Sequence, residues 1–211
     1  MKKYILFDND GVLVETEMWY YEASKKALKE FFNLDLLFED YMEIMARGGT
    51  AWEKAMKAGK SDEDIVKARK QRNIYYQEYL QTKNIAIPNV TSILKELSKN
   101  YKMAIVTTSR RVDFEIIHKN SGIVEFMDFV LCEEDYNKAK PDPEPYLTAL
   151  AKFGASKEET VIVEDSQRGL TSAYRAGIEC VMVYNEFTKT QNFSNATAKI
   201  EKLEDLIDYL N

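Results

Sequence analysis

The sequence predicts an α/β fold: a doubly wound parallel sheet with an all-helical segment inserted after its first strand. From about residue 88 onward, short apolar runs alternate with stretches of helical spacing. Strands that alternate with helices pair in parallel, with helices on both faces of the sheet. Between residues 16 and 80 we find helical periodicity and no convincing strand. The insertion therefore lies at the sheet edge where open α/β sheets bind ligands.

The composition is that of a globular protein with a sizeable core. The chain has 211 residues, of which 45% are hydrophobic and 30% are charged. A net charge of −6 argues against nucleic acid as a partner, because phosphate backbones require a basic surface. No stretch approaches transmembrane length, so we expect no membrane partner and a cytoplasmic location. Two cysteines (Cys132 and Cys180) and the single His118 argue against a zinc site; we interpret the cysteines as core residues and His118 as a helix-surface residue.

The first predicted strand is the apolar run from Tyr4 to Phe7, and it ends in Asp8, Asp10 and Gly11. Carboxylates two residues apart on an extended segment point the same way and repel each other. A protein tolerates that repulsion when a cation lies between them or when one acid stays protonated. This pattern favours a metal and phosphoryl-transfer site, but an ordinary Asp-rich turn explains it equally well.

The inserted segment is expected to hold four helices. Ser61 and Asp64 form a capping-box-like start for the longest of them, and a turn at residues 47–50 separates the second from the third. The predicted helices cover residues 19–31, 41–45, 52–56 and 61–80.

The remainder of the chain alternates between the two kinds of element. Glycines after the helices supply stop signals. The strands are predicted at residues 103–107, 129–131, 161–164 and 180–183, and the helices at residues 93–97, 112–119, 143–153, 170–176 and 200–210.

Polar residues stand at the ends of four predicted strands. Because the carboxyl ends of parallel strands lie on one edge of a sheet, these residues can converge there. They are Asp8 and Asp10 after the first strand, Thr107, Thr108 and Ser109 after the second, Lys140 in the loop after the third, and Glu164, Asp165 and Ser166 at the fourth.

Together these groups form a coherent set for phosphoryl transfer. A carboxylate can attack phosphorus to give an aspartyl-phosphate, and a second carboxyl can protonate the leaving oxygen and then activate water. Oxygen ligands such as Asp8 with Glu164 or Asp165 suit Mg²⁺. Lys140 offers a cation, and Thr107 a hydroxyl, to the phosphoryl oxygens. Each group alone has an ordinary explanation as a turn, loop or helix cap.

At this point the sequence resembles the haloacid dehalogenase-like (HAD) hydrolase superfamily over nearly the whole chain. Residues 8–13 look like its motif I, Thr107 falls in motif II, Lys140 in motif III, and Glu164 with Asp165 in motif IV. Residues 164–169, followed by Ala176 and Gly177, are similar to the β-phosphoglucomutase/phosphoglycolate phosphatase branch, and so is a helical (C1-type) cap directly after motif I.

The resemblance implies a Rossmann-like catalytic core of residues 1–14 and 87–211 and a helical cap of residues 15–86. It implies that Asp8 is the nucleophile and Asp10 the general acid and base. Thr107 and Lys140, with Thr108 beside them, would bind the phosphoryl group. The Asp8, Glu164 and Asp165 side chains and the Asp10 main-chain carbonyl would hold Mg²⁺.

Some positions depart from the family pattern. Asn9 is polar where relatives commonly carry an apolar residue; we expect it to point away from the site and assign it no chemistry. Asp10 argues against dehalogenation, because the dehalogenases of the superfamily lack an acid there. Tyr20 replaces the hinge histidine of β-phosphoglucomutase, and Ala51 follows Thr50 where that enzyme's cap carries a phosphate-gripping arginine. These losses favour hydrolysis over mutase activity.

We therefore predict a Mg²⁺-dependent phosphatase that hydrolyses a sugar phosphate or a phosphoglycolate-like metabolite. A sugar phosphomutase is the alternative, and a binding protein without turnover is a third hypothesis, against which the full set of repelling acids argues. Arg47, Thr50 and Tyr20 are candidate substrate contacts, although a basic surface turn and a cap-core aromatic explain them as well. The expected partner is a small-molecule phosphate ester, and the expected state is a monomer, with a homodimer as the alternative.

Overall fold

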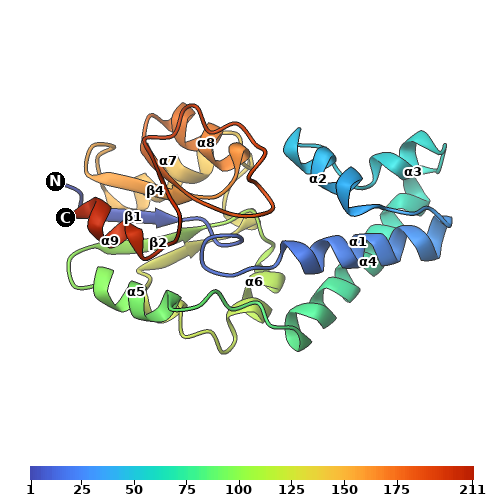
Figure 1. Cartoon of the computed structure of the whole chain (residues 1–211), viewed down its shortest axis with the longest axis horizontal. Coiled ribbons are helices and arrows are strands. Elements are labelled where there is room, and N and C mark those ends of the chain that lie inside the picture. Colours follow the sequence, from blue (N-terminus) through green and yellow to red (C-terminus); the bar gives the residue numbers. More distant parts are fainter. The chain divides into compact units, whose positions relative to one another are not determined.

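The computed structural model describes all 211 residues and divides into two compact units (Figure 1). The first, which we call the sheet unit, comprises residues Met1–Glu15 and Ala86–Asn211. The second, the helical unit, comprises Thr16–Ile85. No helix in either unit combines the length and the apolar character that crossing a bilayer requires. Whether the units act as a catalytic core and a cap stays a prediction.

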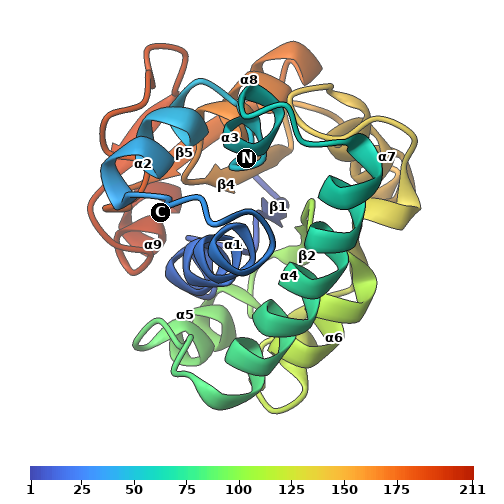
Figure 2. The ribbon, with the colours of Figure 1, turned by 90° about the vertical axis from the view of Figure 1, so that its right-hand side faces the viewer.

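The sheet unit contains a six-stranded parallel sheet in the order β3-β2-β1-β4-β5-β6. The central strand β1 pairs in parallel with both β2 and β4, with Phe7 opposite Ile105 on one side and Val163 on the other. Figure 2 shows the sheet with its strands nearly end-on. The α/β prediction is thereby confirmed. The strands are β1 (Tyr4–Phe7), β2 (Lys102–Val106), β3 (Phe129–Leu131), β4 (Thr160–Glu164), β5 (Glu179–Val183) and β6 (Ala198–Ile200).

Helices cover both faces of this sheet, with α7 and α8 on one side and α5 and α6 on the other (Figure 1). The side chains of Leu6 and Ile162 from the sheet and Tyr146 from α7 meet in one buried core cluster. Both cysteines are buried and unpaired, as predicted. The helical segments of this unit are α5 (Val90–Leu97), α6 (Arg111–His118), the short 3₁₀ turns at Val124–Phe126 and Glu133–Asp135, α7 (Glu144–Phe153), α8 (Gln167–Ala176) and α9 (Asp205–Leu210).

The prediction of one helix over residues 200–210 was wrong. Ile200 ends the edge strand β6, where it pairs with Val183, and helix α9 begins only at Asp205. Strand β6 has three residues, and its middle residue, Lys199, is exposed. So short a strand shows too little alternation for a sequence pattern to reveal it.

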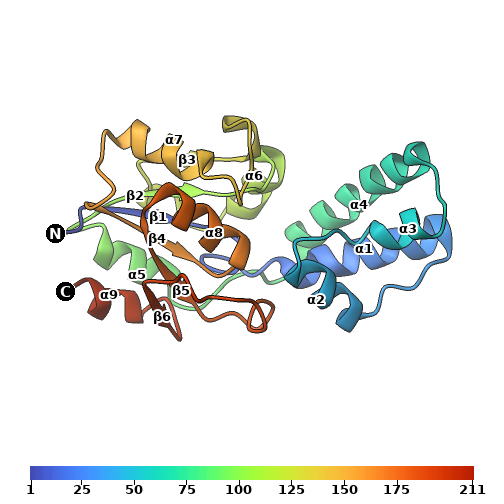
Figure 3. The ribbon, with the colours of Figure 1, turned by 90° about the horizontal axis from the view of Figure 1, so that it is seen from above.

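The helical unit is a bundle of four helices in which α1 and α4 lie side by side (Figure 1, Figure 3). Their buried faces carry small residues, including Ala23, Ala27 and Ala68, which permit close helix packing. The Ser61 hydroxyl accepts a hydrogen bond from the backbone N–H of Asp64 (3.2 Å), so the predicted cap is confirmed. The helices are α1 (Glu17–Phe32), α2 (Phe38–Ala46), α3 (Glu53–Lys57) and α4 (Asp62–Thr82).

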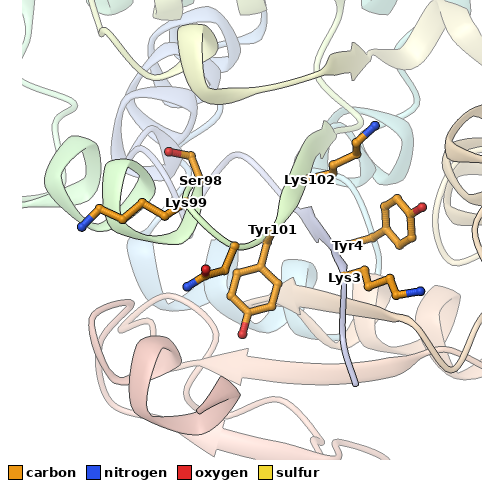
Figure 4. A pocket seen from close by; sticks show the side chains of 7 residues that line it. Lys3, Tyr4, Ser98, Lys99, Tyr101 and Lys102 are labelled. Carbon is orange, nitrogen blue, oxygen red and sulfur yellow. The ribbon is translucent and has the colours of Figure 1, made fainter.

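A basic pocket lies at the amino ends of β1 and β2, away from the carboxyl edge of the sheet (Figure 4). In Figure 4 the amines of Lys99 and Lys102 extend in opposite directions, away from the central Tyr101. Lys3 and Lys99 each form an exposed ion pair with a nearby glutamate. These lysines are ordinary surface charges, and the pocket has no built ligand site.

Candidate active site

The turn after β1 places Asp8 and Asp10 at the carboxyl edge of the sheet. Asp8 continues the strand pairing, since its N–H donates to the Val163 carbonyl oxygen (2.9 Å). The chain then turns tightly around Asn9, whose carbonyl accepts the N–H groups of three residues that follow, with the shortest bond to Leu13 (2.9 Å). The first strand thus ends in a rigid turn that carries both acids.

Only glycine fits at position 11 of this turn. Gly11 has a φ of +82°, a region that side-chain-bearing residues rarely adopt. A Cβ atom there would lie 2.1 Å from the Asp165 carboxylate oxygen Oδ2. Gly11 therefore permits the close approach of the fourth strand's acids to the first strand's turn.

Lys140 lies at the centre of the site and is almost fully buried. Its amine donates to Asp8 Oδ1, to Glu164 Oε1 and to the Val106 carbonyl oxygen, each at 2.8 Å. Burial works to lower the pKa of Lys140, but the attraction of Asp8 and Glu164 outweighs it and raises the pKa above its usual value. Lys140 is therefore a permanent cation between two acids.

Glu164, at the end of β4, is completely buried and accepts five hydrogen bonds. Oε1 accepts from the Lys140 amine and from the Tyr146 hydroxyl (2.7 Å). Oε2 accepts from the Asp165 N–H and from the N–H and hydroxyl of Ser166. Burial tends to raise the pKa of Glu164, but Lys140 and these hydrogen bonds lower it on balance. Glu164 is thus ionised and its oxygens are already engaged.

The environment of Asp8 opposes its ionisation. Burial and the nearby Glu164 carboxylate raise the pKa of Asp8 to about 7, although Lys140 acts in the opposite direction. An additional positive charge beside Asp8 would favour its ionised, nucleophilic form.

Three carboxylates gather where a metal ion could bind. Each of Asp8, Glu164 and Asp165 has a side-chain oxygen that lies within 4.8 Å of the other two. An all-oxygen, anionic donor set is the kind that Mg²⁺ prefers, so the residues present fit this ion. Glu164 is the member least able to give an oxygen to a metal, because its hydrogen bonds already hold it. The Asp10 carboxylate is not in this group.

Asp10 instead faces the turn after β2. Its Oδ2 accepts from the Ser109 hydroxyl (2.8 Å) and lies 3.5 Å from the Thr107 hydroxyl. Thr107 is held by backbone hydrogen bonds, because its N–H donates to Leu131 and its carbonyl accepts from the Tyr136 hydroxyl. Two carboxyls separated by one residue therefore occupy different surroundings, one against Lys140 and the other against hydroxyls.

The remaining predicted site residue of this unit, Thr108, has a different partner. Its hydroxyl accepts from the Arg168 guanidinium (3.1 Å). The structure brings Asp8, Asp10, Thr107, Lys140, Glu164 and Asp165 together, with Thr108 next to Thr107 in the chain. Sequence reasoning did not assign roles to Ser109 and Tyr146, although Ser109 stands in the same polar run as Thr107.

The predicted contacts in the helical unit form two separate groups. Arg47 pairs with Glu53, and the same carboxylate accepts the Thr50 N–H (3.2 Å). Tyr20 instead packs edge-on against Tyr76, with ring centroids 5.2 Å apart. No hydrogen bond or ring contact joins Tyr20 to Arg47 or Thr50. Arg47 already has an anionic partner, Glu53, at the start of helix α3.

Arg72 is a further cation that sequence reasoning missed. Arg72 is 8% exposed, and its guanidinium lies 4.1 Å from the Tyr20 ring centre. Its Nε donates to the Asn73 side chain, and no carboxylate forms an ion pair with it. The sequence did contain a signal that Arg72 is buried, because it follows Ala68 by four residues on the buried stripe of α4.

Asn9 and His118 also differ from expectation. The His118 ring is half-buried, and its Nε2 lies 2.8 Å from Asn9 Oδ1, so its assignment to a helix surface was wrong. Asn9 is fully buried, and its amide nitrogen lies 3.5 Å from Asp10 Oδ2. Asn9 therefore contacts both the acid and the histidine.

Comparisons with known proteins identify the family and the fold. The family model described as haloacid dehalogenase-like hydrolase matches residues 5–183. The chain is similar to the protein CbbY of Rhodobacter capsulatus (28% identity, 95% of this chain and 93% of that protein) and to the pyrophosphatase PpaX of Oceanobacillus iheyensis (29% identity, 85% and 82%). Among solved structures, CbbY of Rhodobacter sphaeroides in complex with xylulose-1,5-bisphosphate has the same fold, with a TM-score of 0.84 over 98% of this chain and 96% of that one, at 22% identity.

Proposed function

This chain belongs to the haloacid dehalogenase-like hydrolase family, and from that premise we propose that it is a Mg²⁺-dependent phosphatase acting on a small phosphorylated metabolite through an aspartyl-phosphate. The observation that carries the proposal is the Lys140 amine, which lies 2.8 Å from both Asp8 and Glu164 while Asp10 lies apart from it among hydroxyls. This arrangement supports different roles for the two acids, with Asp8 as the nucleophile and Asp10 as the proton carrier. The name of the relative PpaX, a pyrophosphatase, and the xylulose-1,5-bisphosphate bound to CbbY of Rhodobacter sphaeroides support phosphate-containing substrates.

In the first step, an oxygen of the Asp8 carboxylate attacks the phosphorus of the ester. The phosphorus–oxygen bond to the alcohol breaks, and Asp10 gives its proton to the leaving oxygen. Lys140 and the Thr107 hydroxyl stabilise charge on the phosphoryl oxygens. Ser109 holds the Asp10 carboxyl in place through its hydroxyl.

In the second step, water attacks the phosphorus of the aspartyl-phosphate. Asp10 takes a proton from that water, the bond between phosphorus and the Asp8 oxygen breaks, and inorganic phosphate leaves. Asp8 and Asp10 return to their starting states, so protons and electrons balance. Bound Mg²⁺, held by Asp8 and Asp165 with Glu164 beside them, would supply positive charge that keeps Asp8 ionised and neutralises the phosphoryl oxygens.

The helical unit supports an anionic metabolite as the substrate. Arg72 is a buried guanidinium without an ionic partner, whereas Arg47 is neutralised by Glu53. Since a buried charge without a partner is costly, we assign Arg72, with Tyr20 beneath it, to binding a charged part of the substrate. The engagement of Arg47 by Glu53 supports hydrolysis over the mutase alternative.

The proposal is tested by release of phosphate from p-nitrophenyl phosphate and a panel of sugar phosphates. Asp8→Asn removes the nucleophile and should lower kcat by at least about 10³-fold. Treatment with EDTA should abolish activity, and excess Mg²⁺ should restore it.

Asp62→Asn is the matched control, because it makes the same substitution at an exposed residue in the first turn of α4. It should behave as the unmodified protein. Undiminished turnover by Asp8→Asn, or in EDTA, would rule out this mechanism.

A further inference from the structure

A chain of three hydrogen-bonding side chains leads to the Asp10 carboxylate, and the proposed reaction does not use it. Ser121, His118 and Asn9 follow one another at hydrogen-bond distance, and Asn9 ends the chain at the Asp10 carboxylate. His118 ends helix α6, and Ser121 lies in the loop that follows. These residues are over a hundred positions from Asn9 in sequence, so the fold alone joins them.

The direction of each hydrogen bond follows from the chemistry of the groups. Asn9 Nδ2 lies 3.5 Å from Asp10 Oδ2, and Asn9 Oδ1 lies 2.8 Å from His118 Nε2. The opposite amide orientation would set two oxygens against each other at Asp10. Asn9 therefore presents N–H to the acid and its oxygen to the ring. Because that oxygen only accepts, His118 Nε2 carries the proton.

The other ring nitrogen of His118 then has to accept. His118 Nδ1 lies 2.9 Å from the Ser121 hydroxyl, which donates to it while accepting the Ile123 N–H (3.1 Å). The Phe114 ring packs on the imidazole, with centroids 4.4 Å apart. Burial lowers the pKa of His118 to about 4, against the opposing influence of Asp10, so the ring stays neutral at working pH. One tautomer and one ring orientation are thus fixed.

Asn9 is well placed to transmit this orientation. Its side chain is fully buried, and its carbonyl anchors the turn by accepting three backbone N–H groups. An apolar residue of similar size would fill the space but would leave the His118 N–H buried without an acceptor, at a cost of about 1–3 kcal/mol. The amide is therefore specified by its partners and not by volume.

We propose that Asn9 and His118 are positioning residues that orient the Asp10 carboxyl for proton transfer to the leaving oxygen. His118 fixes the Asn9 amide, and the Asn9 N–H, together with Ser109, fixes the acid. Neither residue touches the reacting atoms. The inference rests on the proposed function, because it assigns these residues to the acid step of that reaction.

The test exploits the different needs of two leaving groups. An alkoxide requires a proton from the general acid as it leaves, whereas p-nitrophenolate, a stable anion, does not. The variants Asn9→Leu and His118→Phe, which keep size and packing, should lower kcat/KM for glycerol 2-phosphate about 10-fold and for p-nitrophenyl phosphate less than about threefold. A merely structural role would lower both values equally.

Two further variants sharpen the result. His118→Gln keeps an N–H donor for Asn9 and should recover most of the activity toward glycerol 2-phosphate. The double variant Asn9→Leu/His118→Phe should be no worse than either single variant, since each breaks the same chain. Additive losses in the double variant would overturn the proposal. An unchanged ratio of the two kcat/KM values in both single variants would do the same.

Thr197→Val serves as the control for lost stability. It removes one hydrogen bond from the sheet unit, in which the Cys180 N–H donates to the Thr197 hydroxyl (3.0 Å), and it should leave the ratio unchanged. Thermal unfolding of every variant establishes that it is folded. If the unmodified protein hydrolyses neither ester with Mg²⁺, the proposed function fails. If it hydrolyses both and the variants keep the ratio, only the role of Asn9 and His118 fails.

Discussion

Lys140 shows how a single side chain makes a cluster of buried acids tolerable. Its amine donates to Asp8, Glu164 and a backbone carbonyl, so all three of its N–H groups are used. Two carboxylates that repel each other thereby share one cation. The same residue is proposed to stabilise charge on the phosphoryl oxygens, so its charge serves both the fold and the reaction.

Replacement of Lys140 by Met should destabilise the protein strongly. The Asp8 and Glu164 carboxylates would then face each other in a buried site without a cation, and breaking such a buried pair typically costs about 3–5 kcal/mol. Chemical denaturation in the presence of EDTA measures the change in the free energy of unfolding.

Two comparisons separate lost charge from lost packing. Glu164→Gln in the Lys140→Met background removes one of the repelling acids and should recover part of the lost stability. Lys102→Met, at an exposed position of β2, should change stability by less than about 0.5 kcal/mol. Equal losses for the two lysines would show that Lys140 makes no special contribution.

At this scale the sequence predicted that the candidate catalytic groups lie together, but it did not predict the residues that support them. The carboxyl ends of parallel strands must meet, so Asp8, Lys140 and Glu164 could be placed together before the structure was known. The link from Asn9 to His118 depends on the packing of helix α6 against the turn, which no local pattern encodes. A polar residue and the only histidine are weak clues until the fold places them side by side.

At the scale of helices and strands, the periodic spacing of apolar residues decided which elements could be predicted. The four helices of the helical unit and the first five strands were predicted from repeating apolar positions and stop signals. Strand β6 was missed because three residues with an exposed lysine in the middle carry no such signal. Helix α4 was predicted as a helix, but the positive charge of Arg72 on its buried face was not recognised.

That charge leads to a prediction about substrate binding. Arg72→Met keeps the length and apolar packing of the side chain but removes the guanidinium above Tyr20. A lost hydrogen bond to a charged group is worth about 1.5–3 kcal/mol, so KM for a doubly anionic substrate such as a sugar bisphosphate should rise at least about 10-fold. KM for p-nitrophenyl phosphate, which has no second charge, should change little.

Lys70→Met is the matched control for Arg72→Met. It removes one positive charge from the same helix at an exposed position, so it tests whether the overall charge of α4 matters. It should leave KM for both substrates within about twofold, because exposed charges are screened by solvent and salt. A similar rise in KM for both variants would show that Arg72 acts only through the general field of the helix.

At the scale of the whole molecule, the proposed chemistry belongs to one unit. Every group assigned to bond making, bond breaking or metal binding lies in residues 1–15 or 86–211. The helical unit has a buried core of its own, and so does the sheet unit. This division suggests that the sheet unit supplies the reaction and that the helical unit supplies selectivity.

The connections between the units allow a direct test. Val14 and Ala86 form an antiparallel bridge, so the points where the chain leaves and re-enters the sheet unit are adjacent. Residues 16–85 can therefore be replaced by a short Gly-Ser linker without stretching the backbone. The shortened protein should fold, because the linker leaves every strand pairing and the core cluster intact.

We expect this shortened protein to unfold cooperatively and to retain Mg²⁺-dependent hydrolysis of p-nitrophenyl phosphate. It should lose the differences in kcat/KM between metabolites that the full chain shows, because Arg72 and Tyr20 are removed with the helical unit. Asp8→Asn in the shortened protein must abolish the remaining activity, which controls for a contaminating phosphatase. A folded but inactive sheet unit would show that the reaction needs a group from the helical unit, and full selectivity in its absence would place substrate recognition in the sheet unit.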